Sequence, residues 1–181
     1  MPKYAGFWSR ALSIVVDSII FLILGLLFSV AASYISYYLA IVVEVFLLIL
    51  FSSYEILMVG IYGQTIGKWV AGIKVIPIND TEITIRHGLL RYSVDLTTST
   101  FMTISTITAM LAIDPLAFND SGFWDQQALI VHHTPKWYVI IKNISLAWAI
   151  SELLVLLFNK KKRALHDFIA GTVVIHVRRK I

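Results

Sequence analysis

Four long apolar stretches dominate the chain, and polar or charged residues separate them. They cover about residues 11–32, 38–62, 90–113 and 139–158. A helix needs about 20 residues to cross the roughly 30 Å hydrocarbon layer of a bilayer, and each stretch meets that length. The pattern therefore predicts four membrane-spanning helices.

The connections between these stretches predict how the helices are arranged. The link 33–37 is short, so the first two spans form a helical hairpin. A longer outer loop, 114–138, joins the last two. The predicted fold class is an all-α membrane protein: a four-helix transmembrane bundle of two helical hairpins in a single domain, 1–181, with short cytoplasmic β or interfacial segments. The remaining parts are a cytoplasmic link, 63–89, and a cytoplasmic tail, 159–181.

The composition supports a membrane protein. Apolar residues make up 58% of the 181 residues and charged residues 14%, and the mean hydropathy is +0.79. A typical soluble domain has roughly 45–50% apolar and about 25% charged residues. These values argue against a soluble monomer. Because there is no cysteine, disulfides and cysteine-based zinc sites are excluded.

The placement of the basic residues predicts the orientation. If the N-terminus is cytoplasmic, all of the 15 lysines and arginines except Lys136 and Lys142 fall on cytoplasmic segments. The positive-inside rule then predicts a multi-pass protein of the plasma (inner) membrane with both termini in the cytoplasm. This topology also explains the net charge of +4 without a nucleic-acid partner. An interfacial fourth helix is the alternative, and it would place the basic residues 178–180 on the opposite side.

The link between the second and third spans contains two short β-type runs. Ile73–Ile76 and Ile83–Ile85 flank a turn formed by Pro77, Asn79 and Asp80. This pattern predicts a small β-hairpin.

A short internal echo suggests that the chain contains a duplication. Residues 69–76 (WVAGIKVI) follow the first helix pair and residues 168–175 (FIAGTVVI) follow the second, with four of eight positions identical. Our hypothesis is a duplicated unit, a helix pair plus an Ala-Gly-strand segment, whose halves are related by an axis along the membrane normal. Chance similarity in a chain rich in these residue types is the alternative.

Each predicted span carries one acid at a similar depth. An ionisable side chain inside a membrane costs about 2.5–3.5 kcal/mol, so such residues usually face the bundle interior and serve a function. These acids lie about 8–10 Å from the cytoplasmic end of their helices, and we expect them to meet in one layer. They are Asp17, Glu55, Asp95 and Glu152. Glu44 lies in the outer part of the second span and is a candidate for an outer pathway.

Two arginines are placed to balance these acids. Arg10 lies seven residues before Asp17, and Arg91 lies four before Asp95, so each pair shares one helical face. Asp167 lies just before the second echo segment. Two interpretations remain open for this charge cluster: a structural ion-pair network, or a site that exchanges protons for cations.

The sequence indicates no enzymatic activity and no cofactor. Residues 63–69 (GQTIGKW) resemble a phosphate loop only superficially, because the glycine spacing is wrong and Trp69 replaces the Ser or Thr that holds magnesium. The preferred hypothesis is transport of a small cation or proton by a homo-oligomer, since four helices enclose little space. The alternative is a membrane scaffold or assembly factor that binds other membrane proteins.

Three motifs resemble those of the RDD family of membrane proteins. They are YAGFWSR (4–10) followed by Asp17, GQTIGK (63–68) followed by Ala71-Gly72, and HDFIAGT (166–172). The resemblance places the name-giving residues at Arg10, Asp17 and Asp167. It implies a small multi-pass membrane protein of a mostly bacterial family, for which cation/proton exchange has been proposed. The outer loop looks longer than the family's compact form.

Overall fold

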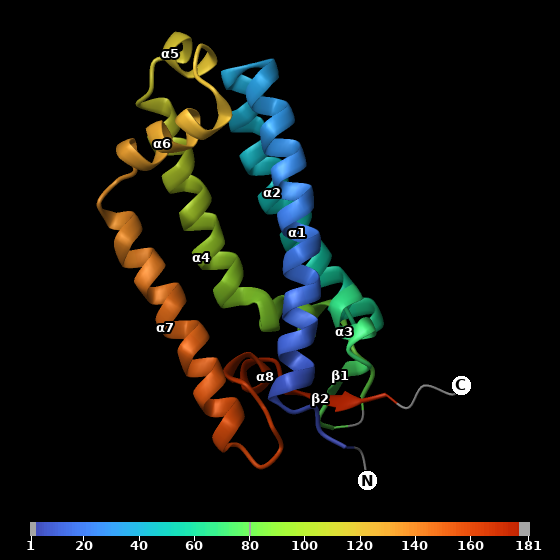
Figure 1. The fold of residues 1–181 in the computed structure, drawn as a ribbon. Helices are drawn as coiled ribbons and strands as arrows, with labels where there is room; N and C mark the ends of the chain where they lie inside the picture. The colour runs from blue at the N-terminus through green and yellow to red at the C-terminus, as the bar shows by residue number, and fades with distance from the viewer. Residues whose placement is uncertain (1–2, 80, 178–181) are drawn as a thin grey trace. The chain divides into compact units, whose positions relative to one another are not determined.

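Helices occupy all four predicted spans. The computed structural model describes residues 3–79 and 81–177, so Asp80, Arg178, Arg179 and Lys180 lie outside the described residues. The long helices are α1 (Phe7–Ile35), α2 (Tyr37–Leu57) with its continuation into the π-helix η1 (Met58–Tyr62), α4 (Ile85–Leu111) and α7 (Trp137–Phe158) (Figure 1). The short elements are α3 (Ile66–Val70), β1 (Ile73–Pro77), α5 (Pro115–Asn119), α6 (Phe123–His133), α8 (Leu165–Ile169) and β2 (Thr172–His176).

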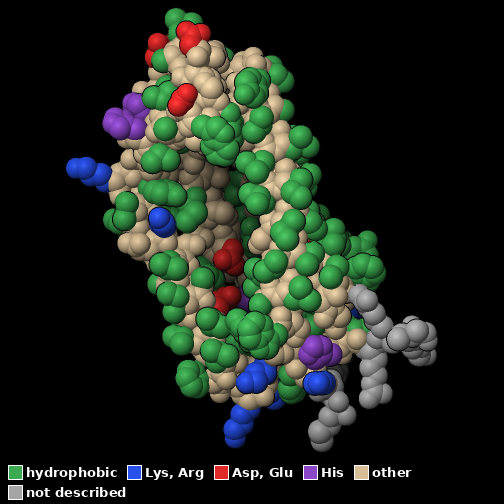
Figure 2. Space-filling model, viewed as in Figure 1, with side chains coloured by type: hydrophobic (Ala, Val, Ile, Leu, Met, Phe, Trp, Pro, Cys, Tyr) green, Lys and Arg blue, Asp and Glu red, His purple; other side chains and the backbone are tan. Residues whose placement is uncertain are grey.

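Three helices in the described part of the chain are long and apolar enough to cross a membrane. By length and composition these are Phe7–Ile35, Tyr37–Tyr62 and Trp137–Phe158. Figure 2 shows hydrophobic side chains over much of the visible face, as expected for helices that contact lipid. Helix α4 has 27 residues, but its hydroxyl-rich run Thr97–Thr100 lowers its hydropathy.

The predicted hairpin between Ile73–Ile76 and Ile83–Ile85 is wrong. Ile85 is instead the first residue of α4. The backbone N–H of Thr84 donates to Nδ1 of His87 at 3.1 Å, and the Thr84 carbonyl accepts from the His87 N–H at 2.9 Å. Such reciprocal bonds between a residue and the one three positions later begin helices. The segment predicted as the second strand therefore leads into α4, and β1 pairs with a different strand.

That partner is β2, which follows the second Ala-Gly pair. The strands are antiparallel, and Val75 lies opposite Val174, its counterpart in the sequence echo. The hydrogen bonds at the two ends of the sheet are equivalent in the two echo segments. The Ile78 N–H donates to the Gly171 carbonyl at 3.0 Å, and the Val177 N–H donates to the Gly72 carbonyl at 2.9 Å. The two echo segments therefore pair about a local two-fold axis. This arrangement fits the duplication hypothesis for these segments, whereas the duplication of the helix pairs stays a prediction.

Glycine is required at the turn between each short helix and its strand. Gly72 and Gly171 both have φ of +65°, a left-handed conformation that residues with a Cβ rarely adopt. The Ala-Gly pair of the echo thus encodes the same change of direction twice, from α3 into β1 and from α8 into β2.

The chain forms two compact units, each with its own core. The first contains the described residues up to Phe21, those from Ser52 to Val94 and those from Leu146 onward. Its core is formed by the sheet, by Val59 and by the N-terminal segment, whose Ala5 N–H donates to the Val174 carbonyl at 2.9 Å. All of the ion pairs described below belong to this unit.

The second unit contains residues 22–51 and 95–145. Segment 114–138, predicted as a loop, contains α5 and α6. Asp114 caps α5, and Pro115 occupies its first position. Tyr37 organises the core: its N–H donates to Asn119 Oδ1 at 2.9 Å and its hydroxyl donates to the Met110 carbonyl at 2.8 Å. The buried residues around it include Ala32, Ala40, Ile113 and Phe118.

The register of the sheet can be tested by cross-linking, because the chain contains no cysteine. Lys74 lies directly opposite Ile175, and Cα atoms of opposed residues in an antiparallel pair are about 4.5–5.5 Å apart, within the Cα–Cα range of disulfides. We expect the variant K74C/I175C to form an intramolecular disulfide on mild oxidation, detected by peptide mass spectrometry. K74C/V174C is the control, because neighbouring side chains of a strand point to opposite faces. Efficient cross-linking of the control alone would contradict the register.

Candidate functional site

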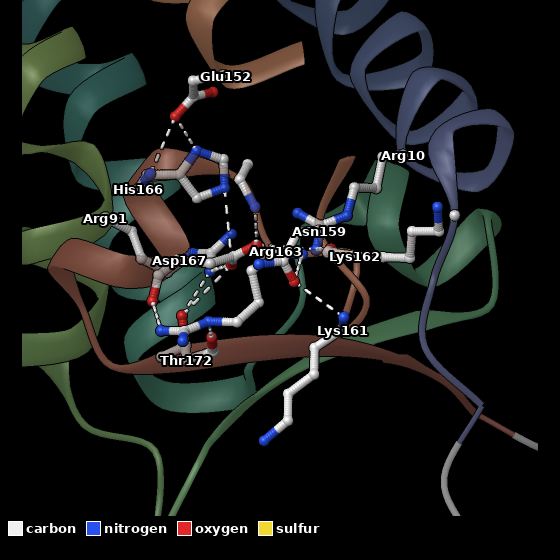
Figure 3. Close-up of polar contacts among 12 residues, drawn as sticks. Arg10, Arg91, Glu152, Asn159, Lys161, Lys162, Arg163, His166, Asp167 and Thr172 are labelled. Carbon is white, nitrogen blue, oxygen red and sulfur yellow. Dashed lines mark hydrogen bonds and ion pairs between the residues drawn. The ribbon is translucent and has the colours of Figure 1, made fainter. Parts of the chain in front are cut away.

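A buried carboxylate joins two arginines that are distant in sequence. Asp167, in α8, is fully buried at 0% exposure. Its Oδ2 forms an ion pair with Arg10 Nη2 at 2.8 Å, and its Oδ1 forms an ion pair with Arg91 Nη1. Arg10 lies in α1 and Arg91 in α4, so the Asp167 side chain connects three helices (Figure 3).

Further hydrogen bonds complete this Asp167 centre. The Ala164 N–H donates to Asp167 Oδ2 at 2.9 Å, which caps the start of α8. Arg91 also donates to Thr172 Oγ1 at 2.7 Å. Arg163 donates to the carbonyls of Asp167 at 2.9 Å and Thr172 at 3.1 Å. The cluster therefore fixes α8 and the first residue of β2 together.

The charges of this centre explain the state of the carboxylate. Burial alone would raise the pKa of Asp167, but the positive charges of Arg91 and Arg10 and the Ala164 N–H hold it well below its usual range. Asp167 is therefore ionised at neutral pH. Breaking a buried ion pair by removing one partner typically costs about 3–5 kcal/mol. The centre has the properties of a structural clamp.

Glu152 and His166 extend the cluster along α7. Nδ1 of His166 donates to Glu152 Oε1, and the His166 backbone N–H donates to the same oxygen at 3.2 Å. Burial and the nearby charge of Arg91 lower the pKa of His166, against the opposing effects of Glu152 and Asp167. The imidazole is thus neutral at pH 7 and serves as a hydrogen-bond donor to Glu152.

A second buried carboxylate, Asp17 of α1, has neutral partners. It is 5% exposed. Its Oδ1 accepts from the Tyr54 hydroxyl at 2.8 Å and from the Gly67 N–H at 2.9 Å, and its Oδ2 accepts from Thr65 Oγ1 at 2.6 Å. A Cβ at position 67 would overlap the Asp17 carboxylate and the Ser13 carbonyl, so only glycine lets α3 approach this closely.

Lys68 and Glu55 border this Asp17 centre. Lys68 Nζ lies 3.7 Å from Glu55 Oε2 and donates to Thr65 Oγ1 at 3.3 Å. Thr65 in turn donates to Asp17. A lysine ammonium, a hydroxyl and two carboxylates therefore form a connected polar chain at the start of α3.

The structure corrects the predicted partner of Arg10. Among the described residues, the ion pair of Arg10 joins it to Asp167, not to Asp17. Arg91, predicted to reach Asp95, makes its ion pair with Asp167 as well. The prediction considered neighbours on the same helix, whereas the acid that both arginines bind comes from α8.

The predicted acids are divided between the two units. Asp17, Glu55 and Glu152 lie in the first unit, each with the partners given above. Asp95 and Glu44 lie in the second unit. The meeting of four acids in one layer therefore stays a prediction. Within residues 3–79 and 81–177, no group of three or more His, Asp or Glu side chains is arranged to hold a metal ion.

Sequence reasoning missed several neutral members of these centres. Tyr54, Thr65 and Thr172 bind the carboxylates or an arginine through their hydroxyls. The echo contains a signal for one of them: Thr65 lies four residues before Trp69, just as Ala164 lies four before Phe168. In the structure both occupy the N-cap position of a short helix.

Because His166 is neutral in the folded state, we predict that lowering the pH reduces the stability of the folded protein. Its pKa is lowered in the folded state relative to about 6.5 in an unfolded chain, so the unfolded chain binds the proton more readily below that pH. Glu152 of α7, Arg91 of α4 and Asp167 face the imidazole. We expect the midpoint of thermal unfolding, Tm, to fall as the pH is lowered through 6.5, and to fall less in the variant H166N, whose amide does not titrate.

The exposed His132 of α6 provides the control, and H132N should keep the wild-type pH dependence of Tm. Equal pH dependence in wild type and H166N would show that His166 does not titrate between the folded and unfolded states as described.

The comparisons with known proteins identify the family of the chain. The model of the RDD family matches residues 4–171, which includes Arg10, Asp17 and Asp167. Neither the curated proteins nor the solved structures gave a match. The match covers nearly the whole chain and agrees with the apolar helices, which indicate a membrane protein. The chain belongs to the RDD family.

Proposed function

We propose that this protein transports a small cation or a proton across the plasma membrane, and that Asp17 is the residue that exchanges the ion. RDD membership and the apolar helices support the membrane location. Four spans with both termini in the cytoplasm accord with the distribution of basic residues. We propose a non-enzymatic role and a homo-oligomer, because four helices leave little room for a pathway.

The hydroxyl bonding of α4 supports its proposed role as the third span. Ser99, Thr100 and Thr108 donate their hydroxyls to backbone carbonyls of their own helix at 2.6, 2.7 and 2.7 Å. A hydroxyl that is satisfied within its helix costs less in lipid than a free one. The polar run of α4 is therefore compatible with a membrane-spanning position.

The observation that carries the proposal is the contrast between the two buried aspartates. Asp167 is neutralised by two arginines. The hydrogen bonds described for Asp17 all come from neutral donors, namely Tyr54, Thr65 and the Gly67 backbone. A buried negative charge without a directly bound cation is costly in a membrane. A proton or a metal cation that binds there removes this cost.

The chemistry of the Asp17 centre suits either species. Carboxylate and hydroxyl oxygens are the ligands that hard cations prefer. Asp17, Tyr54 and Thr65 place such oxygens together, and Glu55 adds a second carboxylate beyond Thr65. The same oxygens can pass a proton along their hydrogen bonds.

Reconstituted vesicles test the proposal directly. Purified protein in liposomes should change the internal pH after pulses of Na⁺, K⁺ or Li⁺, measured with a trapped pH-sensitive dye. The variant D17N should reduce this flux to the level of empty vesicles, because the asparagine oxygen still accepts hydrogen bonds but has no charge to exchange.

The control is D125N, which removes an exposed carboxylate from α6 and should keep the wild-type flux. Full flux in a D17N protein with unchanged Tm would contradict the role of Asp17. Absence of wild-type flux with every cation would contradict transport and favour the scaffold alternative.

A further inference from the structure

The loop between α7 and α8 concentrates positive charge at the end of a membrane-spanning helix. Lys160, Lys161, Lys162 and Arg163 follow directly after Asn159. Lys160 and Lys161 are exposed, and Phe158 beside them is 85% exposed. The basic loop, residues 159–163, therefore places cations next to an apolar side chain where α7 ends.

Hydrogen bonds within the basic loop hold it in one shape. Asn159 Oδ1 accepts from the backbone N–H of Lys161 at 2.8 Å and from that of Arg163 at 3.4 Å. The Lys162 N–H donates to the Asn159 carbonyl at 3.0 Å. Figure 3 shows the Lys161 side chain pointing away from the Asp167 centre. Its ammonium is therefore available to a ligand outside the protein.

The first half of the chain contains a segment equivalent to the basic loop, residues 60–64, and it carries no charge. Aligned by the echo, Lys162 corresponds to Gly63, and both have positive φ, 50° and 72°. Residues 60–64 (GIYGQ) contain no charged side chain. Lys162 is the non-glycine residue in the described part of the chain with positive φ, a conformation that is unfavourable for lysine. The second half thus carries a run of cations where the first half has glycine and neutral residues.

The basic loop is bonded to the Asp167 centre. The Lys162 carbonyl accepts from Arg10 Nη2 at 2.7 Å, the same nitrogen that binds Asp167. Arg163 binds the Asp167 and Thr172 carbonyls and lies 3.9 Å above the ring of Phe168. A ligand that fixes the loop therefore also fixes the partners of Asp167.

We infer that the basic loop binds the headgroup of an anionic phospholipid and that this binding stabilises the Asp167 centre. Charge complementarity favours this occupant, since clustered cations directly after a membrane-spanning helix attract anionic lipids. The exposed Phe158, Phe168 and Ile169 provide apolar surface for the acyl chains beside the headgroup. The inference is independent of ion transport.

Thermal unfolding in vesicles of defined lipid composition tests the inference. Wild-type protein should have a Tm higher by about 4–8 °C in phosphatidylcholine vesicles containing phosphatidylglycerol than in pure phosphatidylcholine. The variant K160Q/K161Q should lose most of this difference. K136Q/K142Q is the matched control, because it removes the same amount of charge from two lysines outside the basic loop and should respond to the anionic lipid as wild type does.

A second arm separates a lipid from a free anion. Inorganic phosphate added to pure phosphatidylcholine vesicles should leave the Tm unchanged if a lipid headgroup is the ligand. A phosphate effect as large as that of phosphatidylglycerol would overturn the assignment to lipid. Equal lipid responses of K160Q/K161Q and K136Q/K142Q would overturn the assignment to the basic loop.

Discussion

A buried carboxylate shared by two arginines is the interaction on which the first unit depends. Asp167 has no solvent exposure, and Arg10 and Arg91 reach it from α1 and α4. Without this acid, both arginines would be buried charges that lack their carboxylate partner, which is energetically costly. The position of α8, the start of β2 and the basic loop all follow from the same set of bonds. Secondary structure in this unit is therefore organised around charge as well as around an apolar core.

The two buried aspartates have different partners, and the roles that we propose for them differ accordingly. Asp167 is bound by cations and acts as a clamp. Asp17 is bound by the hydroxyls of Tyr54 and Thr65 and by the Gly67 backbone N–H. Both aspartates hold the start of a short helix, Asp17 at α3 and Asp167 at α8. In the function that we propose, Asp17 is the exchange site, while the ion pairs of Asp167 join α8 to α1 and α4.

The sequence predicted the elements whose signal is local. Long apolar runs located the helices, and the Ala-Gly echo located both strands, since each glycine adopts the same left-handed turn. The pairing of those strands, and the binding of both arginines to Asp167, join residues far apart in the chain, so helical spacing could not reveal them. The false hairpin arose because Ile83–Ile85 resembles a strand until the bond between Thr84 and His87 is considered. The hydroxyl of Tyr54 was missed because a single polar residue carries no pattern, whereas the position of Thr65 in the echo was a signal that the prediction did not use.

A double-mutant cycle between Arg91 and Asp167 tests the central claim most directly. The free energy of unfolding would be measured in detergent for R91Q, D167N and the double variant. D167N removes the carboxylate that both arginines bind, and R91Q leaves Asp167 with Arg10 but without Arg91. The double variant should therefore lose less stability than the sum of the two, with a coupling of roughly 0.5–3 kcal/mol. R86Q, which alters an exposed arginine near the start of α4, should combine additively with D167N. Additive losses for R91Q and D167N would contradict the account.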